Sequence, residues 1–220
     1  MAVITISRQF GSAGTQAASR VCDLLGYRYL DKVLMTQVAT EAGLLGKEFV
    51  DFSEERSEVR NFLDRLLHPG PHSVARVATR SRDAAGRETL SLEQLDEARC
   101  AKLVRGAIHA AYQQGDVVIM GRGGQVTLKE MPGVLHVRIV APMGSRILRI
   151  QSQEGVDAEQ ARRLAVAHDQ ATTRYLKQLF GVRGDEPELY HMVINTGKWS
   201  PGVAAQIIYN AVEQLPMESQ

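Results

Sequence analysis

The sequence predicts a three-layer α/β/α fold built on a parallel five-stranded sheet, with a helical insert. Segments with helical apolar spacing separate successive strand-like runs, and this alternation indicates a parallel sheet. A small-residue loop follows the first run directly, as in folds that bind phosphate between a strand and a helix. The five short apolar runs that suggest buried strands are residues 3–6, 27–30, 116–120, 135–140 and 190–194.

Composition limits the class of protein. With 220 residues, of which 44% are hydrophobic, the chain can form one large domain or a core with a smaller insert. A net charge of +1 and 5% aromatic residues argue against a nucleic-acid-binding module. No apolar run approaches the ~20 residues that span a bilayer, and the chain enters a strand without a secretory signal pattern. Two cysteines in helix-like segments fit a reducing compartment, so we expect a cytoplasmic protein.

The loop after the first strand is the first candidate site. Aligned with the phosphate-binding pattern G-x-x-x-x-G-K-[S/T], its first glycine falls on Arg8, its lysine on Gly14 and its hydroxyl residue on Thr15. Backbone amides do the cradling, so the loop can bind phosphate without the lysine. Arg8 is a candidate to supply the missing cation, and a tight turn without a ligand is the alternative. The candidate cradle comprises Gly11, Ser12, Ala13, Gly14 and Thr15.

Two further strand ends carry polar residues. Asp31 follows the second run, where it either caps the next helix or offers a carboxylate at the edge of the loop. Arg122 lies among glycines after the run 116–120, and its guanidinium can form a bidentate pair with a phosphate or carboxylate. An exposed glycine turn is the alternative for Arg122.

Residues 46–91 differ in character and suggest an insert. An amphipathic helix around Phe62 is expected to pack on its own core or on a second copy, which leaves a homo-oligomer open. Four arginines then follow, either approaching phosphate groups or forming a solvated face. Ser91 is expected to cap the next helix, which carries Leu92 and Leu95.

A long polar helix is expected from about residue 157 to 180, with Asp157 and Gln160 as a capping-box pair. It is either a lid over phosphates or a solvated helix with internal ion pairs. Its charged residues include Arg162, Arg163, Asp169 and Arg174.

Seven stretches together resemble the cytidylate kinase-like family, whose phosphate loop has the approximate form S-R-E-F-G-S-G-G. They cover nearly the whole chain in order, and their order and spacing carry the resemblance. The stretches are ITISRQFGSAG (4–14), YLDK (29–32), IMGRG (119–123), 136–150, 169–180, PELY (187–190) and VINT (193–196).

The resemblance implies a nucleoside monophosphate kinase fold with an acceptor-binding insert at 46–91 and a lid at roughly 155–180. It implies ATP and Mg²⁺, with residues 8–15 around the donor phosphates and Thr15 toward the metal. Asp31 and Arg122 match positions that hold the acceptor nucleotide. Arg8, Arg122, Arg163, Asp169 and Arg174 become the catalytic candidates.

Departures from the family pattern leave three functions open. Gln170 and Thr172 stand where the family lid has arginines, and Met120 stands where cytidylate kinase has an acid. The first function is ATP-dependent phosphoryl transfer to a nucleoside monophosphate, with a cytidylate-type acceptor favoured. The second is a nucleotide-binding regulator without transfer, and the third is a kinase for a non-nucleotide acceptor.

Overall fold

A parallel five-stranded sheet forms the centre of the computed structural model, which describes residues 2–30, 76–82, 88–94 and 97–215. The strand order β2-β5-β1-β6-β7 places β1 in the middle, paired with β5 and β6. The strands are β1 (Val3–Arg8), β2 (Arg28–Leu30), β5 (Val117–Met120), β6 (Val134–Val140) and β7 (Met192–Asn195). The predicted parallel sheet is therefore confirmed, with strand ends shifted by one or two residues.

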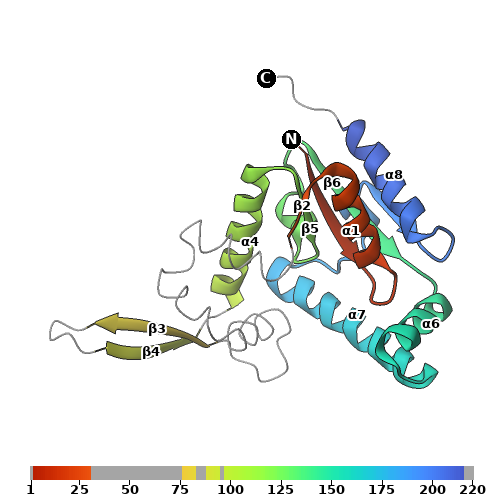
Figure 1. Ribbon diagram of the computed structural model, residues 1–220. Coiled ribbons are helices and arrows are strands. Elements are labelled where there is room, and N and C mark those ends of the chain that lie inside the picture. Colours follow the sequence, from red (N-terminus) through yellow and green to blue (C-terminus); the bar gives the residue numbers. More distant parts are fainter. Residues whose placement is uncertain (1, 31–75, 83–87, 95–96, 216–220) are drawn as a thin grey trace.

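Helices cover both faces of the sheet and make the three layers (Figure 1). Helices α1 (Gly14–Leu25) and α8 (Pro201–Glu213) pack on the face that carries Ile4 and Ile6. Helices α4 (Glu97–Gln114) and α7 (Ala158–Phe180) pack on the face that carries Val3. Alternate residues of β1 enter the two cores because successive side chains of a strand point to opposite faces. Within the described ranges, no helix is long and apolar enough to cross a membrane.

The predicted start of the long polar helix is confirmed. Asp157 accepts a hydrogen bond from the Gln160 backbone amide at 2.7 Å and begins α7. Ser200 caps α8, with Pro201 at its first position. A short loop after α6 (Met143–Glu154) turns the chain into α7, and the two helices share a small apolar cluster around Ile150.

The insert differs from the prediction. Its described residues form an antiparallel hairpin of β3 (Arg76–Arg82) and β4 (Glu88–Gln94), so the helical interpretation of 46–91 is wrong for these residues. Ser91 pairs with Thr79 in this hairpin and caps no helix, because α4 begins only at Glu97. The polar–apolar alternation along β4 fits a strand, and leucines at short spacing do not by themselves distinguish the two structures. Asp31 and the helix expected around Phe62 lie outside the described residues.

Two loops meet at the carboxyl edge of the sheet. The loop after β1 leads into α1, and the loop after β5 leads into α5 (Gly124–Thr127). These strands are neighbours in register, with Ile6 opposite Met120. Helices α1 and α5 leave these two strands toward opposite faces of the sheet. At such a point open α/β sheets bind ligands.

Candidate functional site

The loop between β1 and α1 is built to meet an anion. Gly11 and Ala13 have left-handed backbones, with φ of 75° and 59°, and for alanine this conformation is strained. No side chain of the described residues caps α1 at Ala13. The amides of Gly14, Thr15 and Gln16 have no intrahelical acceptor in the first turn, and the helix dipole adds positive charge there. The loop therefore offers unpaired donors at a positive helix end.

Side chains outside the loop hold its carbonyl groups. Arg146 Nε donates to the Phe10 carbonyl at 2.6 Å, and Thr196 Oγ1 donates to the Ser12 carbonyl at 2.6 Å. Arg149 donates to the intervening Gly11 carbonyl at 3.4 Å and to the Thr196 carbonyl at 2.7 Å. Three successive carbonyls are thus satisfied by protein, and the Ser12 amide donates to the Gln9 carbonyl. The amides at the start of α1 remain for a ligand.

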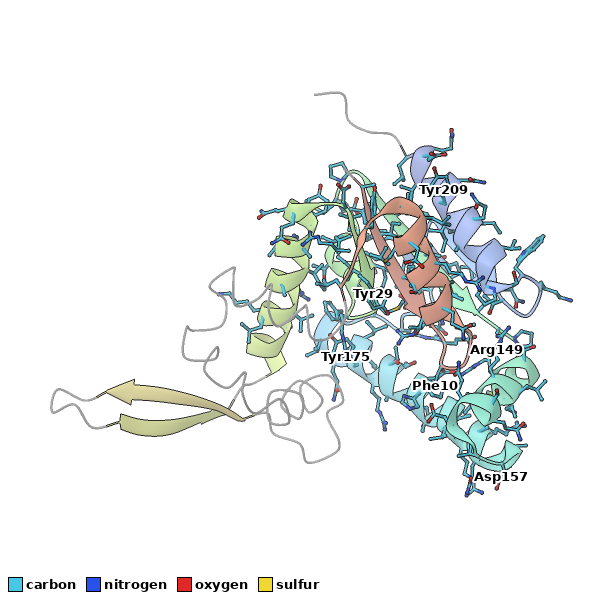
Figure 2. The ribbon with its side chains drawn as sticks, in the orientation of Figure 1. Phe10, Tyr29, Arg149, Asp157, Tyr175 and Tyr209 are labelled. Carbon is cyan, nitrogen blue, oxygen red and sulfur yellow. The ribbon has the colours of Figure 1, made fainter. Side chains whose placement is uncertain are left out.

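Helix α7 fixes the tip of the loop. The Asp169 carboxylate accepts hydrogen bonds from the Phe10 amide at 3.2 Å and from Arg146 Nη2 at 2.7 Å. The Phe10 ring stacks on His168, with the ring centroids 4.1 Å apart. Figure 2 shows Phe10 between the loop end of α1 and α7, with Arg149 on the side of α6. Because both Asp169 oxygens are used in this way, the structure supports a positioning role for this residue.

The predicted cradle residues differ in what they contribute. A side chain at Gly11 would lie 2.8 Å from Ile150 Cδ1, so the loop can approach α6 only with glycine. Thr15 is exposed on the first turn of α1, so its hydroxyl is open to solvent. The Ser12 side chain is fully buried, and its Oγ has no hydrogen-bond partner among the described residues. Its hydroxyl is the kind of buried group that a bound ligand or water satisfies.

Arg8 lies at the other end of the same loop. Its side chain is exposed, and its aliphatic stem lies against Gly14. Desolvation by the surrounding protein lowers the pKa of Arg8, and the nearby Tyr29 acts in the opposite direction. The group nevertheless stays cationic at neutral pH, because arginine titrates far above it and this side chain keeps its solvent exposure.

The second loop presents Arg122. Gly121, Arg122 and Gly123 are all left-handed, with φ of 67°, 61° and 76°. The Gly121 amide donates to the Ile6 carbonyl at 2.9 Å, which ties this loop to the end of β1. Tyr175 of α7 donates to the Arg122 carbonyl at 3.4 Å. A strained non-glycine residue whose loop is held by hydrogen bonds to β1 and α7 is typical of a functional position.

The lid candidates on α7 are not equivalent. Arg163 pairs with Glu159 at 3.3 Å on the exposed side of the helix, so the structure does not bring it to the two loops. Arg174 is exposed and has no hydrogen bond or ion pair within the described part of the chain. It lies between Asp169 and Tyr175, the residues through which α7 holds the two loops.

The structure therefore brings four of the predicted elements to one edge: Arg8, the 11–15 cradle with Thr15, Arg122 and Asp169. Sequence reasoning missed Arg146, Arg149 and Thr196, which position the loop. All three lie in stretches that carry the family resemblance, and that resemblance is the feature of the sequence that could have identified them. Their partners are backbone carbonyls, which no residue pattern specifies.

The site fits Mg²⁺ bound together with a nucleotide. Within the described ranges, no group of three or more His, Cys, Asp or Glu side chains could hold a metal ion. Mg²⁺ commonly keeps several waters and takes its other ligands from phosphates and one or two protein oxygens. The exposed hydroxyl of Thr15 is suited to that single contribution.

Comparisons with known proteins agree with this geometry. Cytidylate kinase of Methanopyrus kandleri is 25% identical over 221 residues, covering 97% of this chain and 94% of that protein. Cytidylate kinase of Pyrococcus horikoshii is also 25% identical, covering 97% and 89%. An uncharacterized protein from Eubacterium ventriosum shares the fold at a TM-score of 0.64 and 17% identity, covering 97% and 99%. The model of the cytidylate kinase-like family matches residues 3–198, and the chain belongs to that family.

Proposed function

We propose that this protein is an ATP-dependent kinase that phosphorylates a nucleoside monophosphate, with a cytidylate-type acceptor favoured. The observation that carries the proposal is the 8–15 loop. Its carbonyls are held on the outside by Arg146, Arg149 and Thr196, and its amides stand at an uncapped helix end beside Arg122. Relatives across nearly the whole chain are named cytidylate kinase, which supports nucleotide kinase activity.

In the proposed reaction the phosphate loop binds the donor and Thr15 helps to hold Mg²⁺. A phosphate oxygen of the acceptor attacks the γ-phosphorus, the bond to the β–γ bridging oxygen breaks, and ADP leaves. Catalysis of this kind is mainly positioning and charge neutralisation. Arg122 and Asp31 are proposed to hold the acceptor, with the 46–91 insert beside it. The loop that carries Arg122 adjoins the end of β1, which supports this role for Arg122.

Helix α7 is proposed to act as a lid through its exposed arginines. Arg174 is the stronger candidate, since Arg163 is already paired with Glu159. Asp169 then supports the reaction indirectly by holding Phe10. The proposal also includes a cytoplasmic location and small-molecule substrates, and it leaves a homo-oligomer open.

The test is ADP release from Mg²⁺-ATP with CMP, dCMP, UMP, AMP or GMP added separately, against a control without acceptor. We expect release that depends on the acceptor and is fastest with a cytidylate. Arg122→Ala should lower turnover much more than it lowers the melting temperature. An Arg122→Ala protein with unchanged turnover would remove Arg122 from the reaction.

A nucleotide-binding regulator is the second candidate, favoured by two observations. Gln170 and Thr172 replace lid arginines, and the Asp169 carboxylate is occupied by Phe10 and Arg146. Loss of one positive group near a transferring phosphoryl can lower the rate by orders of magnitude. ATP that raises the melting temperature without any product would favour this function. Product formed only with a non-nucleotide acceptor would favour the third function.

A further inference from the structure

We infer that the phosphate loop of this protein carries its cation at the end next to the strand, where the common pattern has glycine. At the end next to the helix it carries glycine, where the common pattern has lysine. The common pattern has glycine at the position of Arg8 and lysine at the position of Gly14. Here Arg8 supplies the cation for the donor phosphates from the end of β1, and Gly14 is a glycine because the Arg8 stem fills the space of the lysine. The inference rests on the proposed function and deepens it, since it names the group that binds the ATP phosphates.

The packing around Gly14 is the first support. A Cβ atom built there would lie 2.8 Å from Arg8 Cβ, 3.0 Å from Cδ and 3.4 Å from Cγ. Real Cβ atoms essentially never come as close as the first of these distances, and the nearest atom is the base of the arginine rather than its flexible end. No side chain, lysine included, can therefore stand at position 14 while Arg8 keeps its place.

The backbone gives a second support. Gly11 has a left-handed backbone that favours glycine for its own conformation, but Gly14 is not among the residues with positive φ. Position 14 is the first residue of α1, where most residues are accommodated. Glycine is thus required at this position for space, and the atoms that demand the space belong to Arg8.

Charge is the third support. Arg146 and Arg149 also approach the loop, but they donate to the carbonyls of Phe10 and Gly11. Arg8 has no hydrogen bond or ion pair to another residue in the described ranges, and its side chain reaches solvent. Its guanidinium is therefore available, and its planar fork suits two phosphate oxygens at once.

The consequence is chemical as well as spatial. Lysine offers a compact ammonium from the helix end, whereas Arg8 offers a fork from the strand end. In both arrangements the cation offsets negative charge on the donor as the γ-phosphoryl group leaves ADP. The positive group that the sequence lacks at position 14 is thus replaced within the same loop.

The experiment restores the common pattern in three variants: Arg8→Gly, Gly14→Lys and the double variant Arg8→Gly/Gly14→Lys. Affinity for Mg²⁺-ATP is measured by calorimetry, with adenosine as a ligand that lacks phosphate. Arg20→Ala is the matched control, because Arg20 is an exposed arginine on α1 beside α8. Melting temperatures are measured alongside.

We expect Arg8→Gly to weaken ATP binding about 10- to 100-fold, the usual effect of losing a charge-assisted hydrogen bond, and to leave adenosine binding unchanged. Gly14→Lys alone should lower the melting temperature through the collision with Arg8. The double variant should recover both the melting temperature and ATP binding, with an ATP affinity within about tenfold of that of the natural protein. Arg20→Ala should bind ATP normally.

Three results would overturn the inference. Arg8→Gly could bind ATP as well as the natural protein does. A folded double variant could bind ATP no more tightly than Arg8→Gly. Gly14→Lys could melt at the same temperature whether Arg8 is present or not. Failure of the proposed function is seen in the natural protein itself. If the natural protein binds ATP but transfers no phosphate, the proposed function fails and the inference stands. If it binds no ATP, both fail.

Discussion

The ion pair between Arg146 and Asp169 offers the sharpest test of how the phosphate loop is held. Arg146 Nη2 lies 2.7 Å from Asp169 Oδ2, and the exposed fractions of the two side chains are 3% and 31%. The other Asp169 oxygen accepts from the Phe10 amide, and Arg146 donates to the Phe10 carbonyl. Asp169→Ala therefore removes the partner of a buried cation and one anchor of the loop in a single change.

The expected loss of stability follows from this burial. Removing one member of a fully buried pair costs about 3–5 kcal/mol, because the remaining charge loses its compensation. Asp169 is partly exposed and Arg146 keeps its bond to Phe10, so we expect a loss near the lower end, about 3 kcal/mol. For a chain of this size such a loss corresponds to a melting temperature lower by about 6–12 °C. The KM for ATP should rise as well, because the Phe10 amide at the tip of the loop loses its hydrogen-bond acceptor.

Urea unfolding and ATP-dependent turnover are the two assays, with Glu159→Ala as the control. Glu159 pairs with Arg163 on the same helix, but those side chains are 67% and 73% exposed, so the control should stay within about 0.5 kcal/mol of the natural protein. An Asp169→Ala protein as stable as the control would refute the anchoring argument. Unchanged stability with a large loss of kcat would instead support the catalytic role that the sequence suggested for Asp169.

Two further predictions concern the core and the second loop. Burial and the neighbouring His191 lower the pKa of His136 from 6.5 to about 4. As the pH falls, His136 is therefore protonated in the unfolded chain before it is protonated in the folded protein. The free energy of unfolding should fall by about 2 kcal/mol from pH 7 to pH 5. Urea unfolding at both pH values checks this, and a pH dependence that persists in His136→Gln would contradict it. Gly123→Ala should cost roughly 2–4 kcal/mol, since it combines left-handed strain with a methyl group 2.5 Å from the Phe180 ring. Gly121→Ala, which has a similar φ and nothing within 4 Å, should cost only about 1–2 kcal/mol in thermal unfolding; equal losses would show that Phe180 does not restrict the loop.

Sequence periodicity located the central sheet well. The runs around Ile4, Val118 and Val137 are apolar because both faces of their strands are covered by helices, and such runs stand out without any alignment. The cap at Asp157 was also predictable, because a cap depends on neighbouring residues alone. Local signals of this kind do not depend on the rest of the chain.

The missed features depend on partners that are distant in sequence. Arg146 serves Phe10, 136 residues away, and Thr196 serves Ser12, 184 residues away, and in each case the acceptor is a backbone carbonyl. A carbonyl is present at every residue, so nothing in the composition marks which one needs a donor. The hairpin of β3 and β4 was missed for a different reason, because Leu90 and Leu92 suit a strand and a helix almost equally.

Helix α7 relates the two candidate loops more rigidly than the notion of a lid suggests. His168 and Asp169 hold Phe10 of the phosphate loop, and Tyr175 holds the Arg122 carbonyl of the second loop. With a rise of 1.5 Å per residue, Asp169 and Tyr175 stand about 9 Å apart along one helix. A rotation of the whole helix would break or displace both attachments. Its first turns pack with α6 in the apolar cluster around Ile150, against which Phe10 of the phosphate loop also packs. We therefore expect the part of α7 from His168 to Tyr175 to keep the spacing between the donor loop and Arg122 constant.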